Sequence, residues 1–121
     1  MNKLYIIGNL TNDPELRTTT AGKDVCTFNV AVNRPRKNGQ DQGADFFRVS
    51  AWDILGKNCK QFLAKGRKVA VVGAVSVHVF TSNNGEARAN MEVRADDVEF
   101  LSPKGDGMTR VNDPDDPFGG M

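Results

Sequence analysis

One segment carries more functional information than any other in the chain: Ala44-Asp45-Phe46-Phe47-Arg48-Val49-Ser50-Ala51-Trp52. Side chains alternate across a strand, so Phe47, Val49 and Ala51 share one face that suits a core. The other face combines two aromatic rings with a guanidinium and a hydroxyl: Phe46, Trp52, Arg48 and Ser50. Such a face suits stacking on flat ligands flanked by negative charge, most commonly unpaired nucleotides. A strand buried on both faces is the alternative.

The composition predicts one ordinary globular domain. Of the 121 residues, 39% are hydrophobic and 26% are charged, which allows a core without staples. No apolar run approaches the ~20 residues of a membrane helix, and residues 4–7 are too short for the core of a secretory signal. We therefore expect a cytoplasmic protein, in which Cys26 and Cys59 are two buried thiols rather than a disulfide.

The sequence lacks the residue patterns of the common catalytic and metal sites. One histidine and two distant cysteines cannot supply a zinc site at any usual ligand spacing. No phosphate-binding glycine-rich motif, nucleophile elbow or histidine-centred constellation is present. The sequence thus predicts no catalytic residues, no metal and no cofactor.

Charge is divided unevenly along the chain. Residues 1–101 hold 14 Lys and Arg against 11 Asp and Glu, a net charge of +3, whereas residues 102–121 carry −2. A basic body with an acidic tail is typical of a polyanion binder whose tail has a separate role, although the asymmetry is small.

Alternation and turn signals predict five strands and one helix. The strands are expected at 3–10, 25–33, 44–52, 68–81 and 86–101, and the helix at 54–65. Asp53 is expected to cap the helix, and Gly66 to end it as a left-handed residue. The inner face of the fourth strand is expected to comprise Val69, Val71, Val75, Val77 and Val79. In the fifth strand, a bulge at Asp96-Asp97 would bring Val98 and Phe100 into phase.

This order predicts an all-β protein with an OB-fold, a five-stranded barrel with one helix between its third and fourth strands. The barrel domain is expected to span residues 1–101. Residues 102–121 are rich in Gly, Pro and Asp and have little to bury, so we expect a disordered acidic tail. Its tip places one aromatic ring beside carboxylates and is interpreted as a docking peptide for partner proteins: Asp113, Asp115, Asp116, Pro117 and Phe118. A solubilising tail is the alternative.

A second strand repeats the mixed face of the first. The outer face of residues 68–81 carries Phe80, near the hairpin tip, together with Ser76 and His78. Phe46, Trp52 and Phe80 therefore all lie out of phase with the core, on strands that an OB-fold brings together. The basic residues expected to follow phosphates are Arg34, Arg36, Lys37, Arg48 and Arg88.

Several segments resemble bacterial and phage single-stranded DNA-binding proteins. They are Gly8-Asn9-Leu10-Thr11-Asn12-Asp13-Pro14-Glu15-Leu16-Arg17, Phe28-Asn29-Val30-Ala31-Val32-Asn33-Arg34, Ala44–Trp52, Phe62-Leu63-Ala64-Lys65-Gly66 and residues 85–101. The resemblance covers nearly all of residues 2–101. It implies an OB-fold, a homotetramer, and sequence-independent binding of single-stranded DNA in replication, recombination and repair, at the nucleoid and without catalysis.

The resemblance also assigns individual residues. Phe46, Trp52 and Phe80 match the stacking aromatics of the family, and Arg36 replaces a fourth. Phe47 matches a position near the subunit interface. The family ends in Pro-Phe, whereas here Gly119-Gly120-Met121 follows and displaces the terminal carboxylate that helps dock partners.

Two further functions remain open from the sequence. One is a metal-dependent nuclease on an OB barrel, using carboxylates such as Asp45, Asp96 and Asp97. The other is an RNA-binding OB module, although nothing in the sequence selects 2′-hydroxyl groups.

Overall fold

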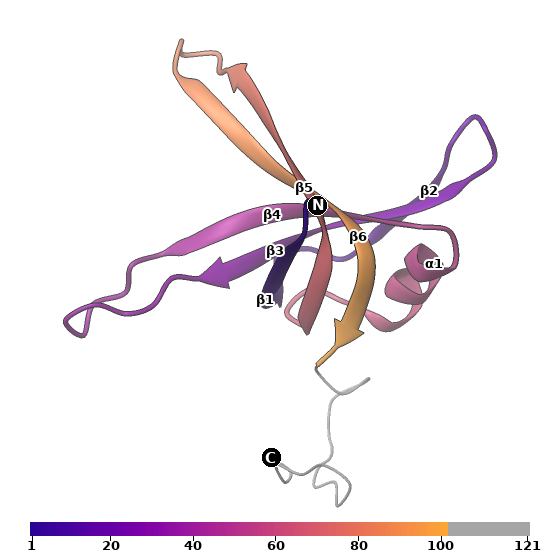
Figure 1. Cartoon of the computed structure of the whole chain (residues 1–121), viewed down its shortest axis with the longest axis horizontal. Coiled ribbons are helices and arrows are strands. Elements are labelled where there is room, and N and C mark those ends of the chain that lie inside the picture. Colours follow the sequence, from indigo (N-terminus) through magenta and orange to yellow (C-terminus); the bar gives the residue numbers. More distant parts are fainter. Residues whose placement is uncertain (102–121) are drawn as a thin grey trace, which may run out of the picture.

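A computed structural model of the chain describes residues 1–101. These residues form the elements β1 (Leu4–Leu10), β2 (Glu15–Thr18), β3 (Asp24–Asn33), β4 (Ala44–Trp52), α1 (Asp53–Phe62), β5 (Lys68–Thr81) and β6 (Ala87–Phe100). Figure 1 shows the strands crossing at the centre of the molecule, with α1 to one side. None of the helices in this part of the chain is long and apolar enough to cross a membrane.

Five of the strands close into a ring. The sheet runs β1-β5-β6-β4-β3-β2, and β1 also pairs with β3, at Asn9 with Ala31 and Leu10 with Val30. The β4–β6 pairing is parallel and the others are antiparallel. This arrangement, with α1 between β4 and β5, confirms the predicted OB-fold.

A glycine allows the barrel to close. A Cβ atom at Gly8 would lie 2.2 Å from the Ala31 carbonyl oxygen on β3. Only a residue without a side chain permits this backbone approach. The first strand predicted from the sequence therefore also contains Gly8, the residue at which the barrel closes.

The core lies where the inward faces of the strands meet. Its largest fully buried side chains are Phe28, Val30, Val49, Val69, Val71, Val93, Cys26 and Cys59. The helix contributes Cys59 to this core, and Leu63 follows directly after it. Both cysteines are free thiols, as predicted. Burial is the main cause that raises the pKa of Cys26 to about 11 and that of Cys59 to about 12.

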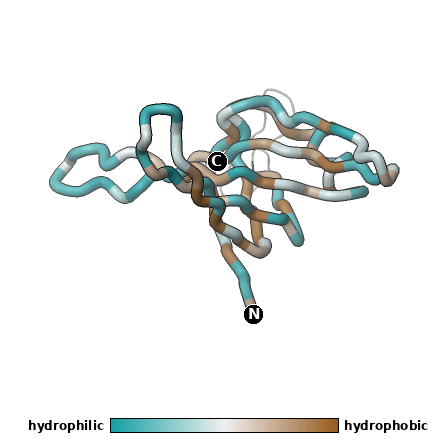
Figure 2. The backbone as a smooth tube through the Cα atoms, turned by 90° about the horizontal axis from the view of Figure 1, so that it is seen from above, coloured by the Kyte–Doolittle hydropathy of each residue, from teal (hydrophilic) through white to brown (hydrophobic). Residues whose placement is uncertain are grey.

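Three hairpins project from the barrel, formed by β2–β3, β3–β4 and β5–β6 (Figure 1). Their tips are hydrophilic, whereas hydrophobic residues concentrate along the strands (Figure 2). The prediction that Val77 and Val79 lie on an inner face is wrong: they are 56% and 69% exposed. Val77 and Val79 do lie on the same face as Val69 and Val71. However, β5 extends beyond the barrel at this point, so that face does not pack against the core there.

Helix and turn details also differ from the prediction. Asp53 makes no capping hydrogen bond, since Trp52 holds the N-cap position and Asp53 itself has a φ of 57°. The helix ends at Phe62, so Gly66, with a φ of 90°, is not its C-cap. Instead, the Gly66 N–H donates to the Leu10 carbonyl at 2.9 Å and joins the loop to β1.

The short strand β2 was not predicted. Its four residues are all exposed and pair with Asp24–Thr27 of β3. The predicted bulge is confirmed, because Val72 pairs with Asp97 and Gly73 with Ala95, leaving Asp96 as the extra residue. The Asp96 carboxylate accepts a hydrogen bond from the Lys3 ammonium group.

Candidate nucleic-acid interface

The two faces of β4 differ as the sequence predicted. Val49 and Ala51 are fully buried, and Phe47 packs against the core. On the other face, Phe46 is 62% exposed, and Arg48 is also exposed. The alternative of a strand buried on both faces is therefore wrong.

Strand register places the three predicted stacking aromatics on one face of the sheet. Directly paired residues point to the same side. Arg48 on β4 pairs with Glu92 on β6, which in turn pairs with Ser76 on β5. By alternation, Phe46 and Trp52 share the side of Arg48, and Phe80 shares that of Ser76. We call this face of β4, β6 and β5 the aromatic face.

The three rings are spread along this face and partly open to solvent. Phe46 lies toward the β3–β4 arm, Trp52 at the other end of β4, and Phe80 near the tip of the β5–β6 arm, where it is 38% exposed. The structure thus brings the rings onto one surface without direct contact between them.

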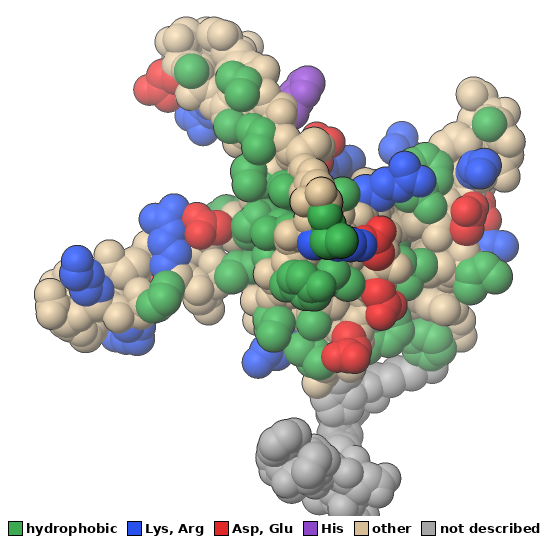
Figure 3. All heavy atoms as spheres, in the orientation of Figure 1, with side chains coloured by type: hydrophobic (Ala, Val, Ile, Leu, Met, Phe, Trp, Pro, Cys, Tyr) green, Lys and Arg blue, Asp and Glu red, His purple; other side chains and the backbone are tan. Residues whose placement is uncertain are grey.

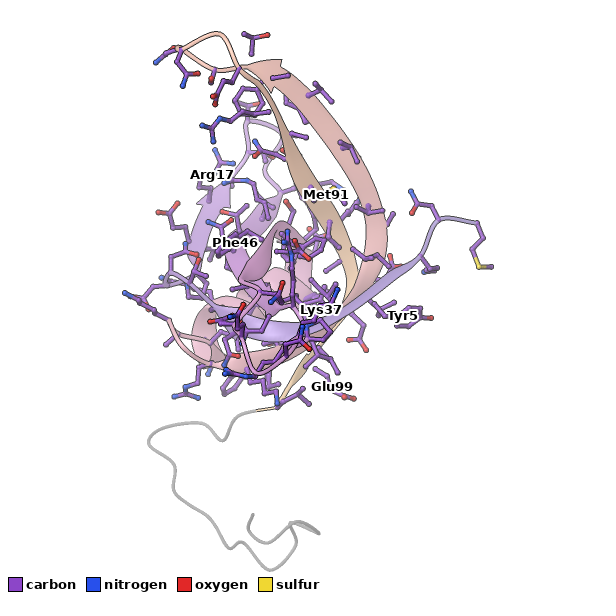
Figure 4. All side chains as sticks on the ribbon, turned by 90° about the vertical axis from the view of Figure 1, so that its left-hand side faces the viewer. Tyr5, Arg17, Lys37, Phe46, Met91 and Glu99 are labelled. Atoms are coloured by element: carbon purple, nitrogen blue, oxygen red, sulfur yellow. The ribbon has the colours of Figure 1, made fainter. Side chains whose placement is uncertain are left out.

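A groove of about 820 Å³ opens where β4 and β6 diverge into their separate arms. Phe46 and Arg48 line it from β4, and Asn90 and Met91 line it from β6. In Figure 4 the labels of Phe46 and Met91 lie next to each other, and Tyr5 lies on the opposite side of the view from Phe46. Phe46, Arg48 and Asn90 line the groove from the aromatic face, whereas Phe47 and Met91, which pair in register, line it from the opposite face.

The predicted basic residues occupy two arms and the centre of the face. Arg34, Arg36 and Lys37 lie on the β3–β4 arm, which shows several basic groups in Figure 3. Arg48 lies at the centre and Arg88 on the β5–β6 arm, paired in register with Phe80.

Two of these cations are already paired with carboxylates. The Arg34 guanidinium donates twice to Asp45 Oδ1, at 3.0 Å from Nε and 2.7 Å from Nη2. This hydrogen bond lowers the pKa of the Asp45 carboxyl group. Arg88 Nη2 lies 3.4 Å from Glu86 Oε1. Because a carboxylate lies beside each of them, Arg34 and Arg88 contribute less net positive charge to this surface than the sequence suggested.

The β3–β4 loop is a folded hairpin tip rather than an open loop. Lys37 and Gln40 exchange backbone hydrogen bonds at 2.9 and 3.1 Å around Asn38-Gly39. Both turn residues have positive φ, 53° and 75°, as a type I′ turn requires. The Arg36 guanidinium donates to the Gly39 carbonyl at 2.6 Å. The Asn-Gly pair is a known hairpin signal that the sequence interpretation did not use.

Comparison with known proteins agrees with this geometry. Residues 1–101 match the sequence model of the Single-strand binding protein family. The chain belongs to this family. The resemblance found in the sequence is thereby confirmed.

Curated members of the family are similar to this chain over most of their own lengths. Single-stranded DNA-binding protein 3 of Listeria innocua is 44% identical over 108 residues, covering 88% of this chain and 68% of that protein. The single-stranded DNA-binding protein of Halalkalibacterium halodurans is 36% identical over 129 residues, covering 99% and 77%. That of Thermotoga maritima is 42% identical over 106 residues, covering 85% and 75%.

The sequence interpretation missed two arginines and a carboxylate on the same side of the sheet as the aromatic face. Arg94 pairs with Ser50, and its guanidinium lies 5.8 Å from the Trp52 ring centroid. Arg17 on β2 pairs with Val25, which pairs with Trp52. Glu92 is the carboxylate, beside Arg48. Glu92 and Arg94 are separated from Arg88 by an even number of residues on β6, so they point to the same face. The alternation of the strand was therefore sufficient to predict them.

Two of the three carboxylates of the nuclease hypothesis are engaged by cations, and the third, Asp97, accepts from the Val98 N–H at 2.9 Å. Asp45 accepts from Arg34 on the β3–β4 arm, and Asp96 accepts from Lys3 at the bulge. Within residues 1–101, no group of three or more His, Cys, Asp or Glu side chains could hold a metal ion. The predicted docking residues Asp113, Asp115, Asp116, Pro117 and Phe118 lie outside the described residues.

Proposed function

We propose that this protein binds single-stranded DNA without sequence preference, by stacking bases on Phe46, Trp52 and Phe80. The observation that carries the proposal is the register of β4, β6 and β5, which places the three rings on one face. Each stacked base contributes roughly 1–3 kcal/mol, and every base has a π-face, so this binding tolerates any sequence.

Phosphate neutralisation is the second part of the proposal. Arg36, Lys37 and Arg48 are the exposed cations of the predicted set for which no ion pair is found among residues 1–101. Arg34 and Arg88, which are paired with carboxylates, add weaker attraction from the two arms. The logarithm of the binding constant should fall with the logarithm of salt concentration, with a slope of roughly −0.7 per phosphate neutralised.

Binding of this kind acts by mass action. A protein that binds only the unpaired strand shifts the duplex equilibrium toward that strand and shields it. It needs no catalytic group, and it would serve replication, recombination and repair of the DNA in the nucleoid. We propose in addition that the tail, ending in Asp115, Asp116, Pro117 and Phe118, recruits other proteins in these processes.

Assembly of several copies is a further part of the proposal. Tyr5 and Ile7 on β1 are exposed and share an apolar pocket with Ala70 and Val72 of β5. Tyr5 faces away from Phe46 (Figure 4), so a second copy seated on β1 would leave the aromatic face open. This supports a homo-oligomer, and the family resemblance suggests a tetramer. Light scattering with and without a long oligonucleotide would give the assembly state and the stoichiometry.

Fluorescence of Trp52 tests the proposed DNA binding. It is the single tryptophan of the chain, so quenching by oligo-dT reports on this site alone. Strong quenching that saturates is expected; unchanged emission at saturating DNA would remove Trp52 from the interface.

Two controls separate the alternatives. Labelled oligonucleotide incubated with Mg²⁺ or Ca²⁺ should stay intact, whereas cleavage would favour a nuclease. Competition between oligo-dT and oligo-U should favour DNA or show no preference; a strong preference for RNA would favour an RNA-binding module.

A further inference from the structure

Trp52 is held by a neighbour from another strand. The Arg94 Cζ atom on β6 lies 5.8 Å from the centroid of the indole ring, within the range of a cation–π contact. Arg94 reaches this position because it pairs with Ser50, two residues before Trp52 on the parallel strand. The two side chains therefore lie on the same face of the sheet.

The sheet beneath Trp52 is covered on both sides. Residues 25–28 of β3 are all buried, although a strand with one open face would alternate. Cys26 and Phe28 belong to the core, whereas Val25 and Thr27 point to the aromatic face and are only 3% and 8% exposed. Their partners on β4 are Trp52 and Ser50. The indole and its neighbours thus pack down on this part of the sheet.

We propose that Arg94 is a positioning residue for single-stranded DNA binding. Its guanidinium covers one face of the Trp52 indole and fixes the ring against β3, so that a single nucleobase stacks on the remaining face. This inference rests on the proposed function. It implies that Trp52 accepts one base rather than inserting between two.

Arginine suits this role better than lysine. Its guanidinium is planar and stacks on aromatic faces, whereas the ammonium group of lysine acts as a compact, strongly hydrated point charge. An arginine that fixes a ring lowers the cost of ordering that ring when the ligand binds. Arg94 would then increase affinity without contacting DNA.

Direct contact between Arg94 and a phosphate is the competing role, and salt dependence separates the two. Loss of a phosphate contact would make the slope of log K against log salt shallower by about 0.7. Loss of a positioning contact would weaken binding at every salt concentration and leave the slope unchanged.

The test compares Arg94→Gln and Arg94→Lys with Lys65→Gln, which removes an exposed cation outside the aromatic face. The first measurement is acrylamide quenching of Trp52 in the free protein, which does not depend on DNA. Arg94→Gln should increase acrylamide access, Arg94→Lys should do so less, and Lys65→Gln should match the parent protein. Thermal unfolding of each variant verifies that it is folded.

The second measurement is oligo-dT affinity over a range of salt concentrations. Arg94→Gln should weaken binding about two- to fivefold with an unchanged slope, and Arg94→Lys should recover part of the loss. In a Trp52→Ala background, Arg94→Gln should have no effect on affinity.

Three results would overturn the inference: unchanged acrylamide access in Arg94→Gln, a slope shallower by about 0.7, or an equal loss of affinity without Trp52. If the parent protein does not bind oligo-dT, the proposed function fails, while the acrylamide result still reports on the Arg94 contact.

Discussion

Truncation of Phe46 should separate binding from folding. The ring is 62% exposed, so Phe46→Ala removes little buried area and should change the free energy of unfolding by only about 0.5 kcal/mol. If a base stacks on the ring, the same change should cost about 1–3 kcal/mol of binding, a loss of about 5- to 150-fold in affinity.

Two reference variants calibrate this prediction. Phe28→Ala truncates a phenylalanine that is 1% exposed, and it should cost about 3–5 kcal/mol of stability. Ile54→Ala removes an exposed apolar side chain from α1, which is not one of the strands of the aromatic face, and should change neither quantity.

The assay is a Trp52 fluorescence titration with oligo-dT at fixed salt, alongside thermal unfolding of the free protein. A folded Phe46→Ala variant that binds as tightly as the parent would refute the stacking role. A loss of stability similar to that of Phe28→Ala would show that Phe46 belongs to the core.

Three further predictions concern barrel closure, the buried thiols and the charge of the aromatic face. Gly8→Ala should destabilise the protein by about 1–3 kcal/mol or more, because its Cβ atom would lie 2.2 Å from the Ala31 carbonyl oxygen. The control Thr20→Ala, in an exposed turn, should leave the melting temperature unchanged. An unchanged melting temperature for Gly8→Ala would contradict the role of Gly8 in barrel closure. Cys26 and Cys59, whose pKa values burial raises to about 11 and about 12, should resist alkylation at pH 8.5 in the folded protein and react at once in denaturant; rapid reaction of the folded protein would be inconsistent with their burial. Glu92→Gln removes a carboxylate beside Arg48 and should strengthen oligo-dT binding, most clearly at low salt; weaker binding would place Glu92 among the contacts that the DNA uses.

Much of the barrel could be predicted because its strands follow a strict period of two. The alternation of Phe46, Arg48 and Trp52 against Val49 and Ala51 is sufficient to predict both faces of β4. The phase break before Val98 likewise predicted the bulge at Asp96. Local patterns of this kind are sufficient to predict strand faces wherever one face of the strand packs against the core.

Features that depend on distant partners could not be predicted. The same alternation holds along the whole of β5, yet Val77 and Val79 lie beyond the barrel and are exposed. Strand β2 has no inward face of its own and exists because β3 extends past the barrel to pair with it. The contact of Arg94 with Trp52 requires the parallel β4–β6 pairing, which no local pattern contains.

Photocrosslinking tests the shared aromatic face most directly. Oligonucleotides carrying 5-iodouracil are irradiated in complex with the protein, and the crosslinked peptides are mapped. Adducts are predicted at Phe46, Trp52 and Phe80, and none at Tyr5, which is 75% exposed in the described chain but lies on the opposite side. Adducts at Tyr5 in place of the three rings would contradict the proposed interface.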